Sequence, residues 1–387
     1  MFITAPLIHN GHCFMPEGTT ISINEGGIIN EILTEPAGGT LHYEGILVPG
    51  FINTHCHLEL SHMQGTIQEH TGLVPFLKNV TLKRNEYTGE QKSTARQTAY
   101  NSLINNGIVA VGDIANTTDS LGLRLMDKLH FHTFIEALGF SDIKAARSFG
   151  YALGTFEAFA AQGQGKKILR QTITPHAPYS VSAALFRAID SHNEQGILSI
   201  HNQESEEENK YYRVKEGGIT DLLGTMGIDD NYFKPTGLSS LQSYMEWLTP
   251  GRQYIFVHNT FTSIEDIQYI KARINSAYWC LCPNANLYIE NRLPDINMLL
   301  NEGVNICIGT DSLASNHQLC ILSELLTIKE NYPAINWETL LSWGTCNGAR
   351  ALQMQDTLGT IEPGKQPGIV QLTGIGEAEK PVIKRVV

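Results

Sequence analysis

Short apolar runs alternate with longer amphipathic segments through the middle of the chain. Eight such runs occur, at 46–55, 107–114, 131–139, 168–176, 197–204, 253–259, 277–286 and 304–311. Segments with helical character lie between them, for example 92–106 and 184–195. Strand-like runs that alternate with helices predict a parallel sheet with crossover helices. Eight such units predict an α/β fold of the (β/α)8 type, the TIM barrel.

The two ends of the chain have a different pattern. Residues 21–33 hold two β-rich runs around a Gly-Gly pair, which predicts a hairpin. Residues 358–374 again show short apolar runs interrupted by glycine and proline. We therefore expect a small β-sandwich domain built from residues 1–46 and 357–387, and a metal-dependent barrel domain over residues 47–356.

Composition and charge narrow the class of protein. The chain has 387 residues, of which 42% are hydrophobic and 17% charged, which predicts a folded protein. A net charge of −12 argues against nucleic acid and anionic membranes as partners. No run approaches the ~20 apolar residues of a membrane span, and the first residues lack a secretory pattern. Seven cysteines without a C-x-x-C pair favour a reducing cytoplasm.

Polar residues gather at the C-terminal ends of the predicted strands, where barrels of this type carry their active sites. His55 and His57 alternate at the end of the first strand, so their imidazoles share one face. His201 and Asp311 end the fifth and eighth strands, where an unpartnered polar group is costly. Three histidines and a carboxylate suit one divalent metal, Zn²⁺ first and Fe²⁺ as the alternative. The competing interpretation, four satisfied core residues, must explain why all four converge.

Three more polar residues lie beside this predicted metal site. Glu204 follows the fifth strand and can move protons between water and substrate, although it also begins an acidic run. His258 ends the sixth strand and can hydrogen-bond a metal-bound water or a developing oxyanion; the alternative is a satisfied core histidine. His176 ends the fourth strand and suits substrate contact as readily as metal ligation.

At these motifs the sequence resembles the amidohydrolase superfamily, in the branch that acts on adenosylhomocysteine, guanine and triazines. The matching segments are VPGFINTHCHLELSHMQG (48–65), TPHAPYSVS (174–182), HNQE (201–204), VHN (257–259), CPNANLYI (282–289) and GVNICIGTDSLASNH (303–317). The resemblance covers nearly the whole chain. It implies the same barrel and a small β-domain to which the last segment of the chain returns.

The resemblance also implies roles for individual residues. The implied metal ligands are His55, His57, His201 and Asp311. The implied catalytic residues are Glu204, His258 and Asp311. His176 would contact the substrate. Because no lysine ends the third or fourth strand, where binuclear relatives carry a carboxylated one, the resemblance implies a mononuclear site.

A narrower similarity lies just after the first strand. HLELSHMQG, followed by HTGLVPFLKNV (70–80), is similar to the group that deaminates 6-aminodeoxyfutalosine in menaquinone synthesis. This similarity implies that Glu59 and Ser61 lie at the substrate pocket. The long segment 205–237 is interpreted as an insertion above the active-site face.

Together these features predict a hydrolase that deaminates a purine-type heterocycle, with 6-aminodeoxyfutalosine as the first substrate to test. Glu204 would protonate a ring nitrogen and later the leaving amine. The alternatives are another nucleoside or nucleobase deaminase (for adenosylhomocysteine, adenosine or guanine) and a triazine hydrolase releasing chloride or an alkylamine. A non-catalytic scaffold is disfavoured because all four ligand positions are filled. The partner is a small heterocyclic molecule, and the resembling group implies a homodimer.

Overall fold

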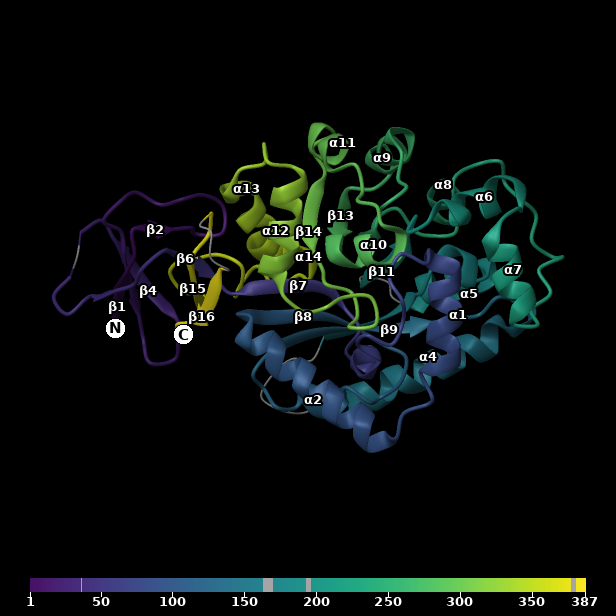
Figure 1. Ribbon diagram of the computed structural model, residues 1–387, viewed down its shortest axis with the longest axis horizontal. Helices are drawn as coiled ribbons and strands as arrows, with labels where there is room; N and C mark the ends of the chain where they lie inside the picture. Colours follow the sequence, from purple (N-terminus) through teal and green to yellow (C-terminus); the bar gives the residue numbers. More distant parts are fainter. Residues whose placement is uncertain (36, 163–169, 193–195, 377–380) are drawn as a thin grey trace.

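The computed structural model describes residues 1–35, 37–162, 170–192, 196–376 and 381–387. Figure 1 shows a large part, in which helices surround strands, and a smaller β-rich part that contains both ends of the chain. The start of the predicted strand 168–176 and the end of the predicted helix 184–195 lie outside the described residues. Within the described ranges, no helix is both long and apolar enough to cross a membrane.

Eight parallel strands form the centre of the large part. One sheet has the order β10-β9-β8-β7, with β7 (Phe51–Cys56), β8 (Ile108–Ala115), β9 (His130–Ala137) and β10 (Arg170–Pro175). The other has the order β11-β12-β13-β14, with β11 (Ile197–Asn202), β12 (Gln253–His258), β13 (Ser276–Leu281) and β14 (Asn305–Ile308). The predicted parallel strands between helices are thus confirmed.

Backbone contacts join these two sheets at both edges. On one side Cys56 and Asp311 form a parallel bridge, and the backbone N–H of Asp311 donates to the carbonyl of His55 at 3.1 Å. On the other side the N–H of His201 donates to the carbonyl of His176 at 3.0 Å. The C-terminal ends of β7, β10, β11 and β14, which are the first, fourth, fifth and eighth strands of the large part, therefore lie around one centre.

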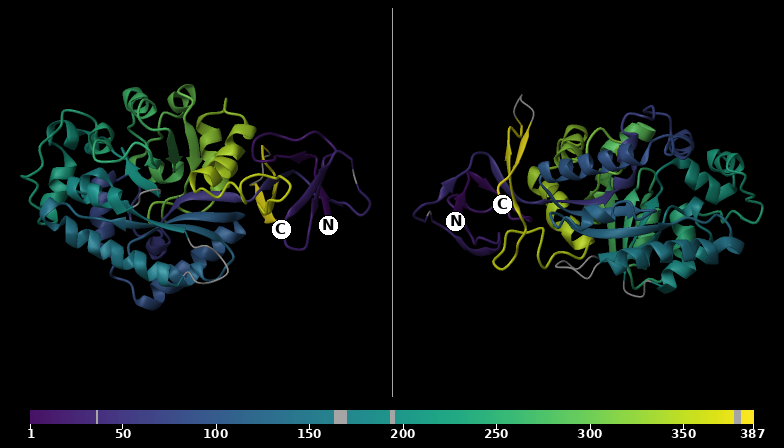
Figure 2. Two further views of the ribbon diagram at one scale, coloured as in Figure 1. Left: turned by 180° about the vertical axis from the view of Figure 1, so that it is seen from behind. Right: turned by 90° about the horizontal axis from the view of Figure 1, so that it is seen from below.

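Helices cover the strands on the outside (Figures 1 and 2). They are α1 (Leu73–Lys83), α2 (Gly89–Asn105), α3 (Leu121–Arg124), α4 (Ala145–Ala161), α5 (Ala183–His192), α6 (Glu206–Val214), α7 (Gly218–Thr225), α8 (Ser240–Met245), α9 (Ile264–Lys271), α10 (Pro283–Glu290), α11 (Ile296–Asn301), α12 (Ile321–Asn331), α13 (Trp337–Ser342) and α14 (Gly348–Ala351). A local sequence signal explains the start of α2, which begins at a capping box in which Thr88 and Gln91 exchange side-chain-to-backbone bonds. The helix predicted at 92–106 is α2, which starts earlier, at Gly89, because Thr88 caps it there.

The small part consists of two four-stranded sheets. The first has the order β4-β3-β1-β5, with β1 (Phe2–Thr4), β3 (Thr20–Ile23), β4 (Ile29–Leu33) and β5 (Leu41–His42). The second has the order β16-β15-β6-β2, with β2 (Leu7–Ile8), β6 (Ile46–Pro49), β15 (Ile369–Thr373) and β16 (Val382–Arg385). The antiparallel pairing of β3 with β4 confirms the hairpin predicted at 21–33.

The predicted run 46–55 is one stretch of sequence but two strands. β6 pairs with β15 in the small part, whereas β7 pairs with β8 in the large part. Gly50 stands between them, and a Cβ there would collide with Val109 and would lie 2.9 Å from the carbonyl oxygen of Pro367. Glycine therefore lets the chain pass between two closely packed sheets, a division that hydrophobicity alone does not reveal.

Candidate functional site

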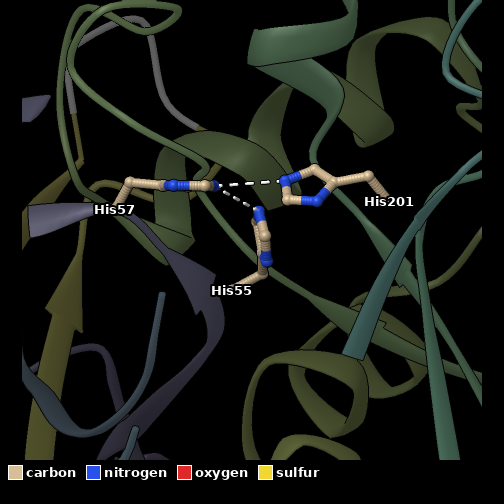
Figure 3. A group of neighbouring side chains, drawn as sticks. All are labelled: His55, His57 and His201. Atoms are coloured by element: carbon tan, nitrogen blue, oxygen red, sulfur yellow. Dashed lines mark hydrogen bonds between the residues drawn. The ribbon is translucent and has the colours of Figure 1, made fainter. Parts of the chain in front are cut away.

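Three imidazoles meet at the ends of β7 and β11. The Nε2 atom of His57 lies 3.1 Å from Nε2 of His55 and 3.2 Å from Nε2 of His201, and Figure 3 shows the three rings pointing toward one another. The Nδ1 atom of His201 lies 2.9 Å from the carbonyl oxygen of His176, to which it donates. Its Nε2 atom therefore presents a lone pair to the cluster, as a metal ligand does.

Asp311 completes this cluster from the end of the eighth strand. Its Oδ1 atom lies 3.6 Å from Nε2 of His55 and 3.3 Å from Nε2 of His57, while its Oδ2 atom accepts a 2.5 Å hydrogen bond from Ser315. The backbone of Asp311 is left-handed, with φ of 56°. This conformation aims the carboxylate back at the histidines just after β14 ends.

The protonation states suit a cation. Burial lowers the pKa of His57 to about 3, so this ring is neutral at physiological pH. Burial alone would raise the pKa of Asp311, but hydrogen bonding to His55 and the neighbouring imidazole of His57 hold it well below its usual range. The ligand atoms of His55, His57 and His201 lie within 4.8 Å of one another, as do those of His55, His258 and Asp311. Neutral imidazoles with an ionised carboxylate form a donor set that fits Zn²⁺ or Fe²⁺.

Glu204 and His258 lie beside the cluster, with Oε1 and Nε2 3.6 Å apart. Both side chains are buried. Burial, with the nearby carboxylates of Asp311 and Glu208, raises the pKa of Glu204 well above its usual range, which favours its protonated form. Burial lowers the pKa of His258 far below its usual value, which leaves this ring neutral. The pair therefore combines a carboxyl group with a raised pKa and a neutral imidazole.

A cavity opens over these groups. Its polar lining includes His57, His176, His201, Glu204, His258 and Asp311. Its apolar lining includes Leu73, Phe76, Leu77, Val80, Leu138, Phe140, Leu222 and Met226. Leu222 and Met226 belong to the predicted insertion 205–237, which thus contributes to the cavity wall. A mixed cavity of this kind suits a flat heterocycle with an apolar substituent.

The residues expected to contact substrate fall into two groups. His176 lines the cavity, and its Nδ1 atom lies 2.6 Å from the hydroxyl of Ser180. Glu59 and Ser61 are buried but do not belong to the cavity lining. Ser61 donates to the carbonyl of Leu58 at 2.8 Å. They occupy a short 3₁₀ turn (Leu58–Met63), and their contact with substrate stays a prediction.

Glu136 is a cavity residue that the sequence reasoning missed. It is the penultimate residue of β9 and lines the cavity together with Asn116. At this position the third predicted strand ends in a glutamate and not in a lysine. The rule that selected the other site residues, a polar side chain at a strand end, applies equally here and would have found it.

Comparison with known proteins gives consistent matches. The model of the amidohydrolase family matches residues 46–386. An adenosine deaminase of Helicobacter pylori is 27% identical over 331 residues, which is 83% of this chain and 77% of that protein. An aminodeoxyfutalosine deaminase of Nitratiruptor sp. is 26% identical over 299 residues, which is 76% of this chain and 71% of that protein. The crystal structure of Helicobacter pylori aminofutalosine deaminase with methylthio-coformycin has a TM-score of 0.79 at 24% identity, covering 95% of this chain and 91% of that one.

Proposed function

This chain belongs to the amidohydrolase family, and on that basis we propose that it hydrolytically removes an exocyclic amino group from a purine-type ring. One observation carries the proposal: Glu204, a buried carboxyl group with a raised pKa, lies 3.6 Å from His258 and beside a cluster of three histidines and Asp311. Deamination of a heterocycle needs an acid of this kind, because an amine leaves only after protonation.

The proposed metal ligands are His55, His57, His201 and Asp311. Their neutral imidazoles and ionised carboxylate favour Zn²⁺, with Fe²⁺ as the alternative. When bound, such an ion supplies Lewis acidity and lowers the pKa of a coordinated water toward ~7.

The side chains divide the proton transfers between them. Glu204 donates its proton to a ring nitrogen, which makes the adjacent amino-bearing carbon electrophilic. His258 and Asp311 orient the attacking water, and Asp311 takes its proton. After the water oxygen has added to the ring carbon, Glu204 takes the second proton of that oxygen and delivers it to the amine, and the proton held by Asp311 returns to Glu204. Ammonia then leaves, and the ring keeps the oxygen.

The first substrate we propose is 6-aminodeoxyfutalosine. Two observations support this choice: the similarity of segment 57–80 to that group of deaminases, and the Nitratiruptor relative, which is named for the same substrate. Adenosine is the second substrate, supported by the Helicobacter relative named adenosine deaminase.

The test is ammonia release from metal-loaded protein given 6-aminodeoxyfutalosine, with adenosine measured in parallel. Glu204→Gln should keep its bound metal and lose about 10²- to 10⁴-fold in kcat, because the amide cannot donate the proton that the reaction needs. Glu157→Gln, an exposed change on α4, is the matched control and should behave as wild type. Near-normal turnover by metal-loaded Glu204→Gln would contradict the proposal that Glu204 acts as the acid.

We also propose the finer architecture: the eight parallel strands close into a (β/α)8 barrel over residues 47–356, and residues 1–46 with 357–387 form a β-sandwich. Support comes from the hydrogen bonds that join both edges of the two parallel sheets, and from the pairing of β15 with β6. Hydrogen exchange should show one protected block for the eight strands and a separate one for the terminal sheets.

A further inference from the structure

The carboxylate of Glu136 has one oxygen that accepts no hydrogen bond in the described part of the chain. Its Oε2 atom accepts a 2.7 Å hydrogen bond from the side-chain amide of Asn116. Its Oε1 atom is buried, and no hydrogen bond reaches it from the described residues. A buried carboxylate oxygen without a donor is costly, so this atom is placed to receive one from a bound molecule.

Glu136 faces the cavity. The residue is 5% exposed and lines the cavity beside the proposed catalytic groups. A carboxylate acceptor in such a place binds a hydroxyl or N–H donor and repels an anion.

Asn116 and Glu59 hold this acceptor in place. Glu59 accepts hydrogen bonds from the backbone N–H groups of Asn116 and Thr117 at 3.0 and 2.9 Å, and from the Thr117 hydroxyl at 2.7 Å. The fixed Asn116 in turn holds Glu136. Asn116 also lines the cavity, and its side-chain amide has a second N–H besides the one it donates to Glu136. An acceptor next to a donor matches a pair of neighbouring hydroxyl groups.

We propose that Glu136, with Asn116, binds the sugar hydroxyls of a purine nucleoside, so that the enzyme acts on ribonucleosides in preference to free bases or deoxygenated sugars. The proposal rests on the proposed deaminase function and names a specificity-determining residue of that site. In this proposal the buried Glu59 is a positioning residue: it holds Asn116 and does not contact the substrate itself.

A competing role for Glu136 would be to orient His201. Its Oε1 atom lies 3.6 Å from Nδ1 of His201, beyond hydrogen-bond distance. The same Nδ1 atom already donates to the carbonyl of His176 at 2.9 Å. His201 is thus oriented by the backbone. Glu136 also belongs, with His176 and His201, to a group whose possible ligand atoms lie within 4.8 Å of one another, so the metal content of a Glu136 variant distinguishes a substrate contact from support of a metal site.

The test compares adenosine with 2′,3′-dideoxyadenosine, which lacks both neighbouring hydroxyls. Each nucleoside is measured by kcat/KM, or by its inhibition constant against 6-aminodeoxyfutalosine if it is not turned over. We expect wild type to favour adenosine by about 10- to 100-fold, the effect of a hydrogen bond to a charged group. Glu136→Gln should lose about that factor with adenosine and less than about 3-fold with the dideoxy compound. Its metal content should equal that of wild type and of the Glu157→Gln control.

Asn116→Ala is the second variant, because it loosens Glu136 without touching a proposed metal ligand; it should reduce the same preference. Equal losses on both nucleosides, or loss of metal from Glu136→Gln, would assign Glu136 to the support of His201 and overturn the proposal. Equal use of both nucleosides by wild type would overturn it as well while leaving deamination intact. If neither these nucleosides nor 6-aminodeoxyfutalosine released ammonia, the proposed function itself would fail.

Discussion

Left-handed backbone positions fix several of the site residues. His258, Asn259 and Asp311 have φ angles of 75°, 61° and 56°. Such conformations cost on the order of 1–3 kcal/mol each for residues other than glycine and persist only where surrounding contacts hold them. Asn259 is held by its backbone N–H, which donates to the carbonyl of Asn202 at 3.0 Å. The two polypeptide turns after β12 and β14 thereby aim His258 and Asp311 at one point.

Strand periodicity explains which site residues could be predicted. His55 and His57 follow the two-residue alternation of a strand, and His201 ends an apolar run, so sequence alone indicated that these side chains meet. Glu59 and Ser61 came from a short string in a 3₁₀ turn. The direction of side chains in such a turn depends on its hydrogen bonds to Asn116 and Thr117, which no periodicity encodes.

Asp113 gives a prediction about pH. This buried carboxyl accepts a 3.1 Å hydrogen bond from the backbone N–H of Leu58, and burial raises its pKa to about 7. In the unfolded chain the pKa of this carboxyl group is ~3.9. Between pH ~3.9 and the folded-state pKa of about 7, only the folded state therefore binds the proton. The free energy of unfolding should therefore fall as pH rises from about 4 to 7, by up to about 1.4 kcal/mol per pH unit from this group.

Asp113→Asn should flatten that slope, as measured by urea unfolding at pH 5, 6, 7 and 8. The Asn oxygen can still accept from Leu58, so the comparison isolates the titration. Glu157→Gln on the surface should leave the slope unchanged. An Asp113→Asn profile parallel to wild type would show that Asp113 is ionised in the folded protein at all these pH values.

At the scale of elements, Gly50 separates two strands that the sequence presents as one. The apolar run 46–55 supplies β6 to the terminal sheet and β7 to the sheet that carries His55 and His57. One partner of β6, β15, lies more than 300 residues away in the chain, so no local pattern could reveal the division. The alternation of strands and helices was predictable because each element is specified within its own segment.

Gly50→Ala should destabilise the protein by about 1–3 kcal/mol, because the new methyl group would collide with Val109 and lie 2.9 Å from the carbonyl oxygen of Pro367. Urea unfolding measures this change. Gly89→Ala, at the start of α2 with open space around it, is the control and should be close to neutral. Equal stability of Gly50→Ala and wild type would mean that the two sheets can separate at this point without cost.

At the scale of the whole molecule, the proposed metal should contribute to stability. The side chains of the four proposed ligands lie at hydrogen-bonding distance from one another or slightly farther apart. Only the folded chain brings them together. Removing the ion with a chelator should lower Tm by several degrees, since a ligand present at 100 times its Kd stabilises by about 2.7 kcal/mol. Thermal unfolding with and without added Zn²⁺ measures the shift. His57→Asn should show a much smaller response, and an unchanged Tm in wild type would contradict a metal site here.

The pairing of β6 with β15 also sets the order in which the molecule can be completed. During synthesis, β6 leaves the ribosome early, but its partner at Ile369–Thr373 is made almost last. A nascent chain that ends near residue 320 already holds His55, His57, His201 and Asp311, yet one edge of β6 is still uncovered. The last segment of the chain, from Ile369 onward and far from any chemistry, thus covers the strand that leads directly into the first two proposed ligands.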